Sequence, residues 1–147
     1  MNIGHQGGEG MVLVVQSLLT LVGHVATRVD FKEAVTGPVA RFRFAVAERR
    51  WDRRRNSWLT GPTSFYTVWA HRGLAANVAG SVSIGEPLIV LGRLRIRDEV
   101  QSEGKRWISA DIDALAVGHD LTRGTSAFRR ALKGPAALTE PQGVLTS

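Results

Sequence analysis

The chain has 147 residues, of which 44% are hydrophobic, and this is enough for one compact domain with a buried core. It contains no cysteine, which excludes disulfide bonds, thiolate zinc sites and thiol catalysis and makes a reducing cytoplasm the expected location. The net charge is +6, the sequence pI is about 11, and lysine occurs only at Lys32, Lys105 and Lys133 among 19 cationic side chains. A polyanionic partner is favoured, because arginine both binds phosphate and stacks on flat rings.

The chain begins with a glycine-rich stretch, and we predict a flexible N-terminal extension over residues 1–16. The sequence leaves open whether Met1 or Met11 is the first residue of the protein. The folded domain is predicted to span residues 17–121. Its first strand covers residues 18–27, where Gly23 indicates a bend or a bulge.

Residues 39–48 (VARFRFAVAE) alternate between apolar and other side chains and predict a half-buried strand. Phe42 and Phe44 lie on one face of this strand, and Arg41 and Arg43 lie on the other. The arginine-rich residues 49–62 predict a long, partly ordered hairpin loop with Trp51 and Trp58 on its two limbs. Residues 64–71, rich in β-branched and aromatic side chains, predict the third strand.

Beyond the third strand, residues 72–79 predict a short helix, because Leu74 and Val78 are spaced i, i+4, and Gly80 is placed to end it. Residues 88–97 and 105–116 predict two more strands, and residues 122–147 have the composition of a disordered tail. One helix between the third and fourth of five strands is the order of the OB-fold, whose exposed sheet face binds oligonucleotides. We therefore predict an all-β protein, a five-stranded OB-fold barrel with flexible termini.

Aromatic rings interleaved with arginines are the feature of this sequence that indicates function. Single-stranded nucleic acid exposes base faces, which stack on rings, and phosphates, which bind cations. The predicted nucleic-acid-binding residues are Arg41, Arg43, Arg50, Trp51, Arg53, Arg54, Arg55, Trp58, Phe65, Trp69, His71, Arg95 and Arg97. Arg49, Arg93 and Trp107 are further candidates. The alternative for each ring is a place in the core, which fits Tyr66, Phe42 and Phe44 best and stays open for Trp69 and Trp107.

Residue patterns that would indicate catalysis or a metal are not found. The four histidines are scattered, with no pair at the spacing of metal ligands. Asp111 and Asp113 would share one face of a strand, but no acid–base partner is evident for them. We expect a non-enzymatic protein with no cofactor and no metal.

Five segments, in order from about Leu19 to Leu121, resemble bacterial single-stranded-DNA-binding proteins, and the shorter actinobacterial members most of all. The segments are Val22–Ala26, Val39–Val46, Trp51–Arg53, Thr63–Trp69 and Leu88–Arg97. The resemblance implies an OB-fold that assembles as a homotetramer, binds single-stranded DNA without sequence preference and has no cofactor. It also implies a cytoplasmic, nucleoid-associated protein that protects single strands in DNA replication, recombination, repair or chromosome segregation.

The resemblance also assigns roles to single positions. They are a stacking aromatic early in the third strand (Phe65), a second ring (His71), a stacking position at the end of the second strand (Trp51 or the adjacent Arg50), basic positions on the fourth strand (Arg95 and Arg97) and a position between subunits (Tyr66).

Two departures from the family pattern limit the resemblance. Asp98, Glu99 and Val100 stand where the family usually has another stacking aromatic, which predicts weaker binding at that point. The sequence lacks the acidic tip by which typical members recruit repair enzymes, so recruitment is not expected. The alternatives are an OB-fold interaction or assembly subunit of a replication-restart complex, with incidental nucleic-acid affinity, and an RNA-binding OB protein.

Overall fold

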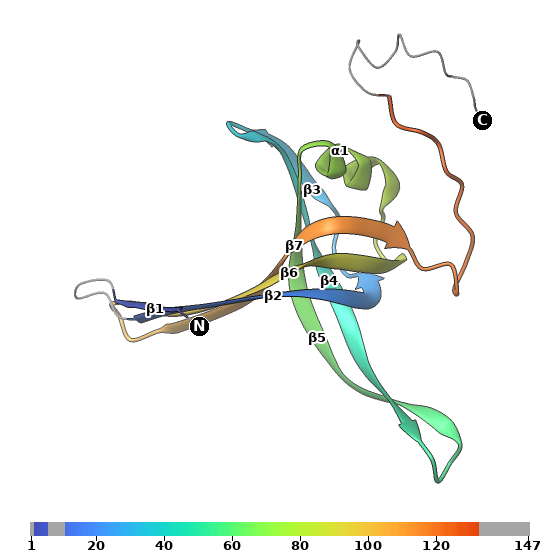
Figure 1. Cartoon of the computed structure of the whole chain (residues 1–147), viewed down its shortest axis with the longest axis horizontal. Helices are drawn as coiled ribbons and strands as arrows, with labels where there is room; N and C mark the ends of the chain where they lie inside the picture. Colours follow the sequence, from blue (N-terminus) through green and yellow to red (C-terminus); the bar gives the residue numbers. More distant parts are fainter. Residues whose placement is uncertain (1, 6–10, 133–147) are drawn as a thin grey trace.

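The computed structural model describes residues 2–5 and 11–132 (Figure 1). The elements of these residues, in chain order, are β1 (Asn2–His5), β2 (Met11–Val25), β3 (Asp30–Ala34), β4 (Gly37–Asp52), β5 (Ser57–His71), α1 (Arg72–Ser81), β6 (Pro87–Val100) and β7 (Arg106–His119). Within this part of the chain, the helix is not long and apolar enough to cross a membrane.

Five strands close into a ring in the order β2, β6, β7, β5, β4. β2 pairs with β6 along most of its length, and it pairs with β4 only through His24–Ala45 and Val25–Phe44. The pairing of β5 with β7 is parallel and joins Thr67–Trp69 to residues 111–113. This order, with α1 between the third and fourth strands of the ring, confirms the predicted all-β OB-fold.

Alternation along the strands places the core inside the ring. Phe42 and Phe44 of β4 are at most 2% exposed, as predicted, and they pack with Val68 and Ile112. α1 packs against β3, β4 and β5 and buries Ala75 and Val78. Gly80 lies inside the helix rather than at its end, because the chain stays helical to Ser81 and becomes extended only at Val82.

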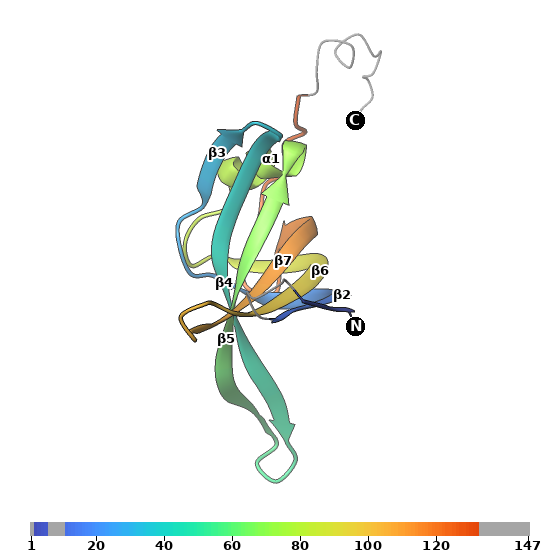
Figure 2. The same ribbon diagram turned by 90° about the vertical axis from the view of Figure 1, so that its left-hand side faces the viewer.

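Two ribbons project from the ring in different directions (Figures 1 and 2). We name residues 49–60 of β4 and β5 the β4–β5 arm, and residues 97–109 of β6 and β7 the β6–β7 arm. The prediction of a hairpin with Trp51 and Trp58 on its two limbs is confirmed, because these two residues lie opposite each other. Most of residues 49–62 is paired strand rather than loop, since β4 continues to Asp52 and β5 begins at Ser57. The turn is only Arg53–Asn56, and Asn56 has a φ of 52°, a left-handed conformation that asparagine tolerates.

The beginning of the chain also differs from the prediction of a flexible extension. β1 pairs with β2, and residues 12–16 of β2 pair with Arg95–Glu99 of β6. Backbone hydrogen bonds to neighbouring strands order this segment, in which residues 11–15 (MVLVV) are β-formers. β3, a short and exposed strand, was not predicted. Residues 120–132 contain no helix or strand, and the rest of the predicted tail lies outside the described residues.

Candidate functional site

β4 and β5 present one outward face that carries most of the predicted residues. Arg41 lies directly opposite Trp69, and Arg43 lies opposite Thr67. Directly opposed residues of an antiparallel pair point to the same side of the sheet, so both arginines share a face with Phe65 and Trp69. Phe42 and Val68, which oppose each other between these pairs, point into the core.

A change of register continues this face onto the β4–β5 arm. Ala47 opposes Thr63 and Arg49 opposes Thr60, so Gly61 and Pro62 lie opposite the single residue Glu48. This is a β-bulge, and the extra residue moves all following side chains to the other side of the strand. Trp58 is an odd number of residues from Phe65, and the bulge therefore brings both rings to one face.

Each ring of the row on β5 has a guanidinium from β4 beside it. The guanidinium carbon lies 5.5 Å from the ring centroid for Arg41 and Trp69, 5.7 Å for Arg43 and Phe65, and 5.0 Å for Arg49 and Trp58. These are cation–π distances. The contact places a cation beside each of these three rings.

The rings of this face differ in exposure. Phe65 is 50% exposed, Trp58 57% and Trp51 44%, so each offers ring surface to a ligand. Trp51 and Trp58 pack edge to face with centroids 5.3 Å apart, which holds both rings on the arm. Trp69 is half-buried, and its indole N–H has no hydrogen-bond acceptor within the described part of the chain.

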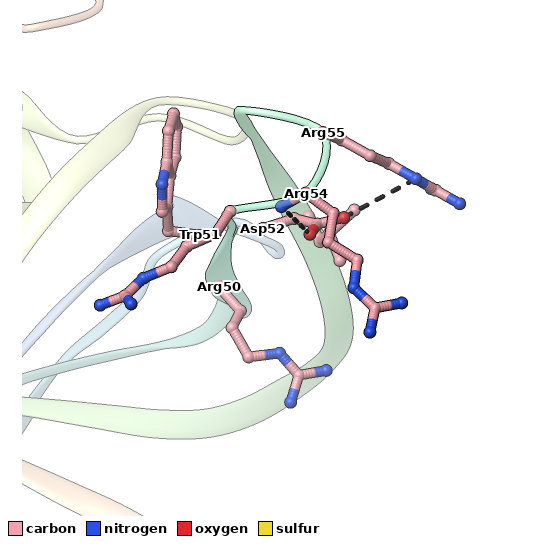
Figure 3. A pocket seen from close by; sticks show the side chains of 7 residues that line it. Arg50, Trp51, Asp52, Arg54 and Arg55 are labelled. Carbon is pink, nitrogen blue, oxygen red and sulfur yellow. Dashed lines mark hydrogen bonds and ion pairs between the residues drawn. The ribbon is translucent and has the colours of Figure 1, made fainter.

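At the tip of the β4–β5 arm, mostly basic side chains surround a hollow of about 490 Å³ (Figure 3). The residues that line it are Arg50, Trp51, Asp52, Arg53, Arg54, Arg55 and Leu59. The carboxylate of Asp52 accepts a hydrogen bond of 3.0 Å from the backbone N–H of Arg54 and lies 3.7 Å from Nε of Arg55. Asp52 thus shapes the turn. It is one carboxylate among four lining arginines, so the hollow keeps a net positive charge. Arg50 and Trp51 point to opposite sides of the ribbon (Figure 3).

A second hollow, of about 370 Å³, lies beside the ring face on the barrel. The residues that line it are Thr27, Arg28, Asp30, Arg41, Phe42, Arg43 and Thr67. Arg43 donates hydrogen bonds to Thr67 Oγ1 (3.1 Å) and, through its backbone N–H, to Thr27 Oγ1 (2.9 Å). The sequence reasoning did not single out Arg28, because it lies between strands, where no alternation assigns it to a face.

The remaining predicted residues, Arg95, Arg97 and His71, differ in ion pairing and exposure. Arg95 forms an ion pair of 3.0 Å with Asp113, and each side chain is 33% exposed. Arg97 is exposed, and the described residues contain no carboxylate within ion-pair distance of it. His71 is exposed at the end of β5 and is the N-cap residue of α1.

Carboxylates near the two ends of the β6–β7 hairpin have lowered pKa values. Arg106 donates two hydrogen bonds, of 2.6 and 2.9 Å, to Asp98 on the β6–β7 arm, which lowers the pKa of that carboxyl and raises the pKa of the guanidinium. At the other end, a hydrogen bond from His119 and another from the Ser83 backbone N–H lower the pKa of Glu86. His119 also bonds Ser126 at 2.8 Å, which fastens the segment after β7 to the barrel.

Comparisons with known proteins agree with this geometry. Residues 17–120 match the single-strand binding protein family. A Streptomyces avermitilis protein named single-stranded DNA-binding protein 2 is 53% identical over 133 residues, which cover 86% of this chain and 84% of that protein. The crystal structure of a small single-stranded DNA-binding protein from Streptomyces coelicolor is 50% identical, with a TM-score of 0.66, and covers 74% of this chain and 98% of that one.

A more distant solved structure shares the fold alone. It is a Plasmodium falciparum SSB in complex with ssDNA, 21% identical with a TM-score of 0.52, and it covers 69% of this chain and 90% of that one.

Proposed function

Because this chain belongs to the single-strand binding protein family, we propose that it binds and protects single-stranded DNA without sequence preference. The observation that supports this most directly is the row of three ring–arginine pairs on the outward face of β4 and β5. Its relatives are named for single-stranded DNA binding, and the family is one of binding proteins rather than enzymes.

The chemistry of this face fits an unpaired strand better than a duplex. Stacking one base on an aromatic ring contributes about 1–3 kcal/mol and is indifferent to sequence, because every base has a π-face. In a duplex the base faces are stacked on each other and cannot reach a protein ring. In an unpaired strand they are accessible, and the exposed rings of Phe65 and Trp58 can stack on them. Arginines beside the rings bind the phosphates that follow each stacked base.

The proposed DNA-binding set contains the predicted residues, the further candidate Arg49, which lies beside Trp58, and Arg28, which only the geometry adds. The predicted residues are Arg41, Arg43, Arg50, Trp51, Arg53, Arg54, Arg55, Trp58, Phe65, Trp69, His71, Arg95 and Arg97. We further propose that residues 17–121 act as the DNA-binding unit of a cytoplasmic, nucleoid-associated homotetramer. The processes we propose for it are DNA replication, recombination, repair or chromosome segregation.

Titration with oligo(dT) tests the proposal. Tryptophan fluorescence should be quenched, because bases stack near Trp51 and Trp58, and log K should fall with log salt at a slope of about −0.7 per phosphate contact. Oligo(U), added as a competitor, reports the preference for DNA over RNA. An unchanged fluorescence at low salt, with no binding of labelled oligo(dT), would contradict the proposal.

Replacing Phe65 by Ala tests the ring face itself. Phe65 is half-exposed and opposes the small Ala45, so we expect the fold to persist and DNA binding to weaken by about 1–3 kcal/mol. Phe128→Ala is the matched control, because Phe128 is also exposed but lies in the segment after β7. An equal loss in both variants would remove Phe65 from the proposed site.

A further inference from the structure

Trp107 lies just after the loop that joins β6 to β7. Its exposed ring is not part of the row of rings on β4 and β5. It is the second residue of β7, is 59% exposed and lies directly opposite Glu99. Within the described residues, it has no aromatic or cation–π partner, unlike Trp51 and Trp58. A large ring in this position gains little from folding, because most of its surface stays in water.

The register places Trp107 on the same face as the proposed DNA site. Arg97 opposes Ser109 and Arg95 opposes Asp111, so Trp107, two residues before Ser109, shares their side of the sheet. Asp111 in turn pairs with Thr67 of β5, between Phe65 and Trp69. One outward face thus runs from β4 across β5 and β7 and out along the β6–β7 arm.

The outward face of β6 on this arm carries one cation, Arg97, and one carboxylate, Glu99. Arg97, two residues before Glu99, is exposed and has no ion-pair partner in the described part of the chain. Asp98 points to the opposite side and is held by two hydrogen bonds from Arg106. Glu99 is then the one carboxylate of β6 on the outward face of this arm, and the ring of Trp107 lies across from it.

We propose that Trp107 is a further base-stacking residue, and that the bound strand continues from Phe65 along β7 onto the β6–β7 arm. This rests on the proposed function. Trp107 lies four residues from Asp111, which corresponds to about 13 Å at about 3.3 Å per residue. A strand that passes Arg97 therefore reaches Trp107 only if the oligonucleotide is long enough to leave the barrel.

The dependence on oligonucleotide length gives a sharp test. Binding of fluorescein-labelled oligo(dT) is measured by anisotropy over a length series within the range of about 4–16 nucleotides that one OB-fold covers. Trp107→Ala should bind the shortest oligonucleotides as the unchanged protein does and lose about 5- to 150-fold in affinity for the longest. Trp107→Phe, which keeps a ring, should retain most of that affinity.

Ile108→Ala is the matched control. Ile108 is the next residue of the same strand, is 60% exposed and points to the opposite face. It should bind all lengths normally. An equal loss in Ile108→Ala, or a loss in Trp107→Ala accompanied by a change in subunit number in light scattering, would overturn the proposal and assign the arm to protein contacts. Normal binding of long oligo(dT) by Trp107→Ala would overturn it as well, while leaving the proposed function intact.

Discussion

Carboxylates of neighbouring strands lie against two arginines of the outward face: Asp113 pairs with Arg95, and Asp30 lies 3.4 Å from Nε of Arg41. An arginine that is already paired must exchange its carboxylate for a phosphate, so it adds less to DNA binding than a free one. Arg97 has no such competitor among the described residues. At the scale of residues, the number of arginines therefore overstates the number of available phosphate contacts.

Replacing Asp113 by Asn should strengthen DNA binding. The change removes the carboxylate that holds Arg95 and leaves a side chain of the same shape, so one more guanidinium can reach phosphate. We expect affinity for oligo(dT) to rise about 2- to 5-fold at about 0.1 M salt and the salt slope to become steeper by about 0.7.

Glu103→Gln is the control for Asp113→Asn, because it removes the same charge from an exposed loop. The measurement is a salt titration followed by anisotropy of a labelled oligonucleotide. An equal gain in both variants would show that net charge, and not the release of Arg95, changes the affinity.

Alternation in the sequence was sufficient to predict which face of β4 is buried, since Phe42 and Phe44 are inward and Arg41 and Arg43 outward. It was not sufficient to predict the ion pair of Arg95 with Asp113. That pair depends on the register between β6 and β7, which shifts at a bulge between Leu91 and Gly92. The pattern of residues within one strand does not determine the register between two strands.

At the scale of elements, the β-bulge at Gly61 and Pro62 determines which side of the β4–β5 arm Trp58 occupies. Proline lacks the backbone N–H that a regular ladder position uses, and glycine accepts the unusual backbone of a bulge. The arginine-rich composition of residues 49–62 suggested a loop. The two limbs with Trp51 and Trp58 were predicted, but their continuous pairing and the shift of register at the bulge are properties of two strands rather than of one segment.

Replacing both Gly61 and Pro62 by Val should remove the bulge. Two β-formers would favour a continuous ladder, which shifts the register by one residue and moves Trp58 to the side away from Trp51 and Phe65. We expect the loss of the near-ultraviolet circular dichroism of the Trp51–Trp58 pair and of one stacking contribution, about 1–3 kcal/mol of DNA binding.

Deletion of Pro62 alone is the matched variant. With one residue fewer, a regular ladder keeps Trp58 opposite Trp51, so both the dichroism and the binding should be retained. If the deletion and the double substitution behaved alike, the bulge would not be what positions Trp58.

At the scale of the whole molecule, the ring closes at a narrow seam between β2 and β4. Only two residue pairs join these strands, and Gly23 lies immediately before them. A Cβ atom at Gly23 would overlap the carbonyl oxygen of Ala45, so the backbones approach as closely as they do because this residue has no side chain. The sequence suggested a bend at Gly23, but the strand that it approaches is 22 residues further along the chain.

Gly23→Ala should therefore destabilise the fold by about 1–3 kcal/mol, the usual cost of overpacking. Gly80→Ala is the opposite case, because Gly80 lies in α1 with open space around its Cα, and alanine should stabilise the helix by up to about 1 kcal/mol. Urea unfolding at constant m-value measures both changes. A neutral Gly23→Ala would show that the seam can widen without cost.

The order of strands and the position of one helix were sufficient to predict the OB-fold. The same reasoning missed β1, which pairs with β2, and the first residues of β2, which pair with β6. Residues 11–15 (MVLVV) are β-formers, but the glycine-rich stretch before them led to the prediction of a flexible extension.

The parallel pairing of β5 with β7 has a consequence for the time course of folding. Thr67 and Asp111 are 44 residues apart, whereas the two arms are hairpins whose partners are close in the chain. Hairpins form in about 1–10 μs, but distant pairings require loop closure, and proteins rich in them fold in about milliseconds to seconds. We therefore expect the β4–β5 arm and the β6–β7 arm to form first as the protein folds, and the closed barrel between them to form last.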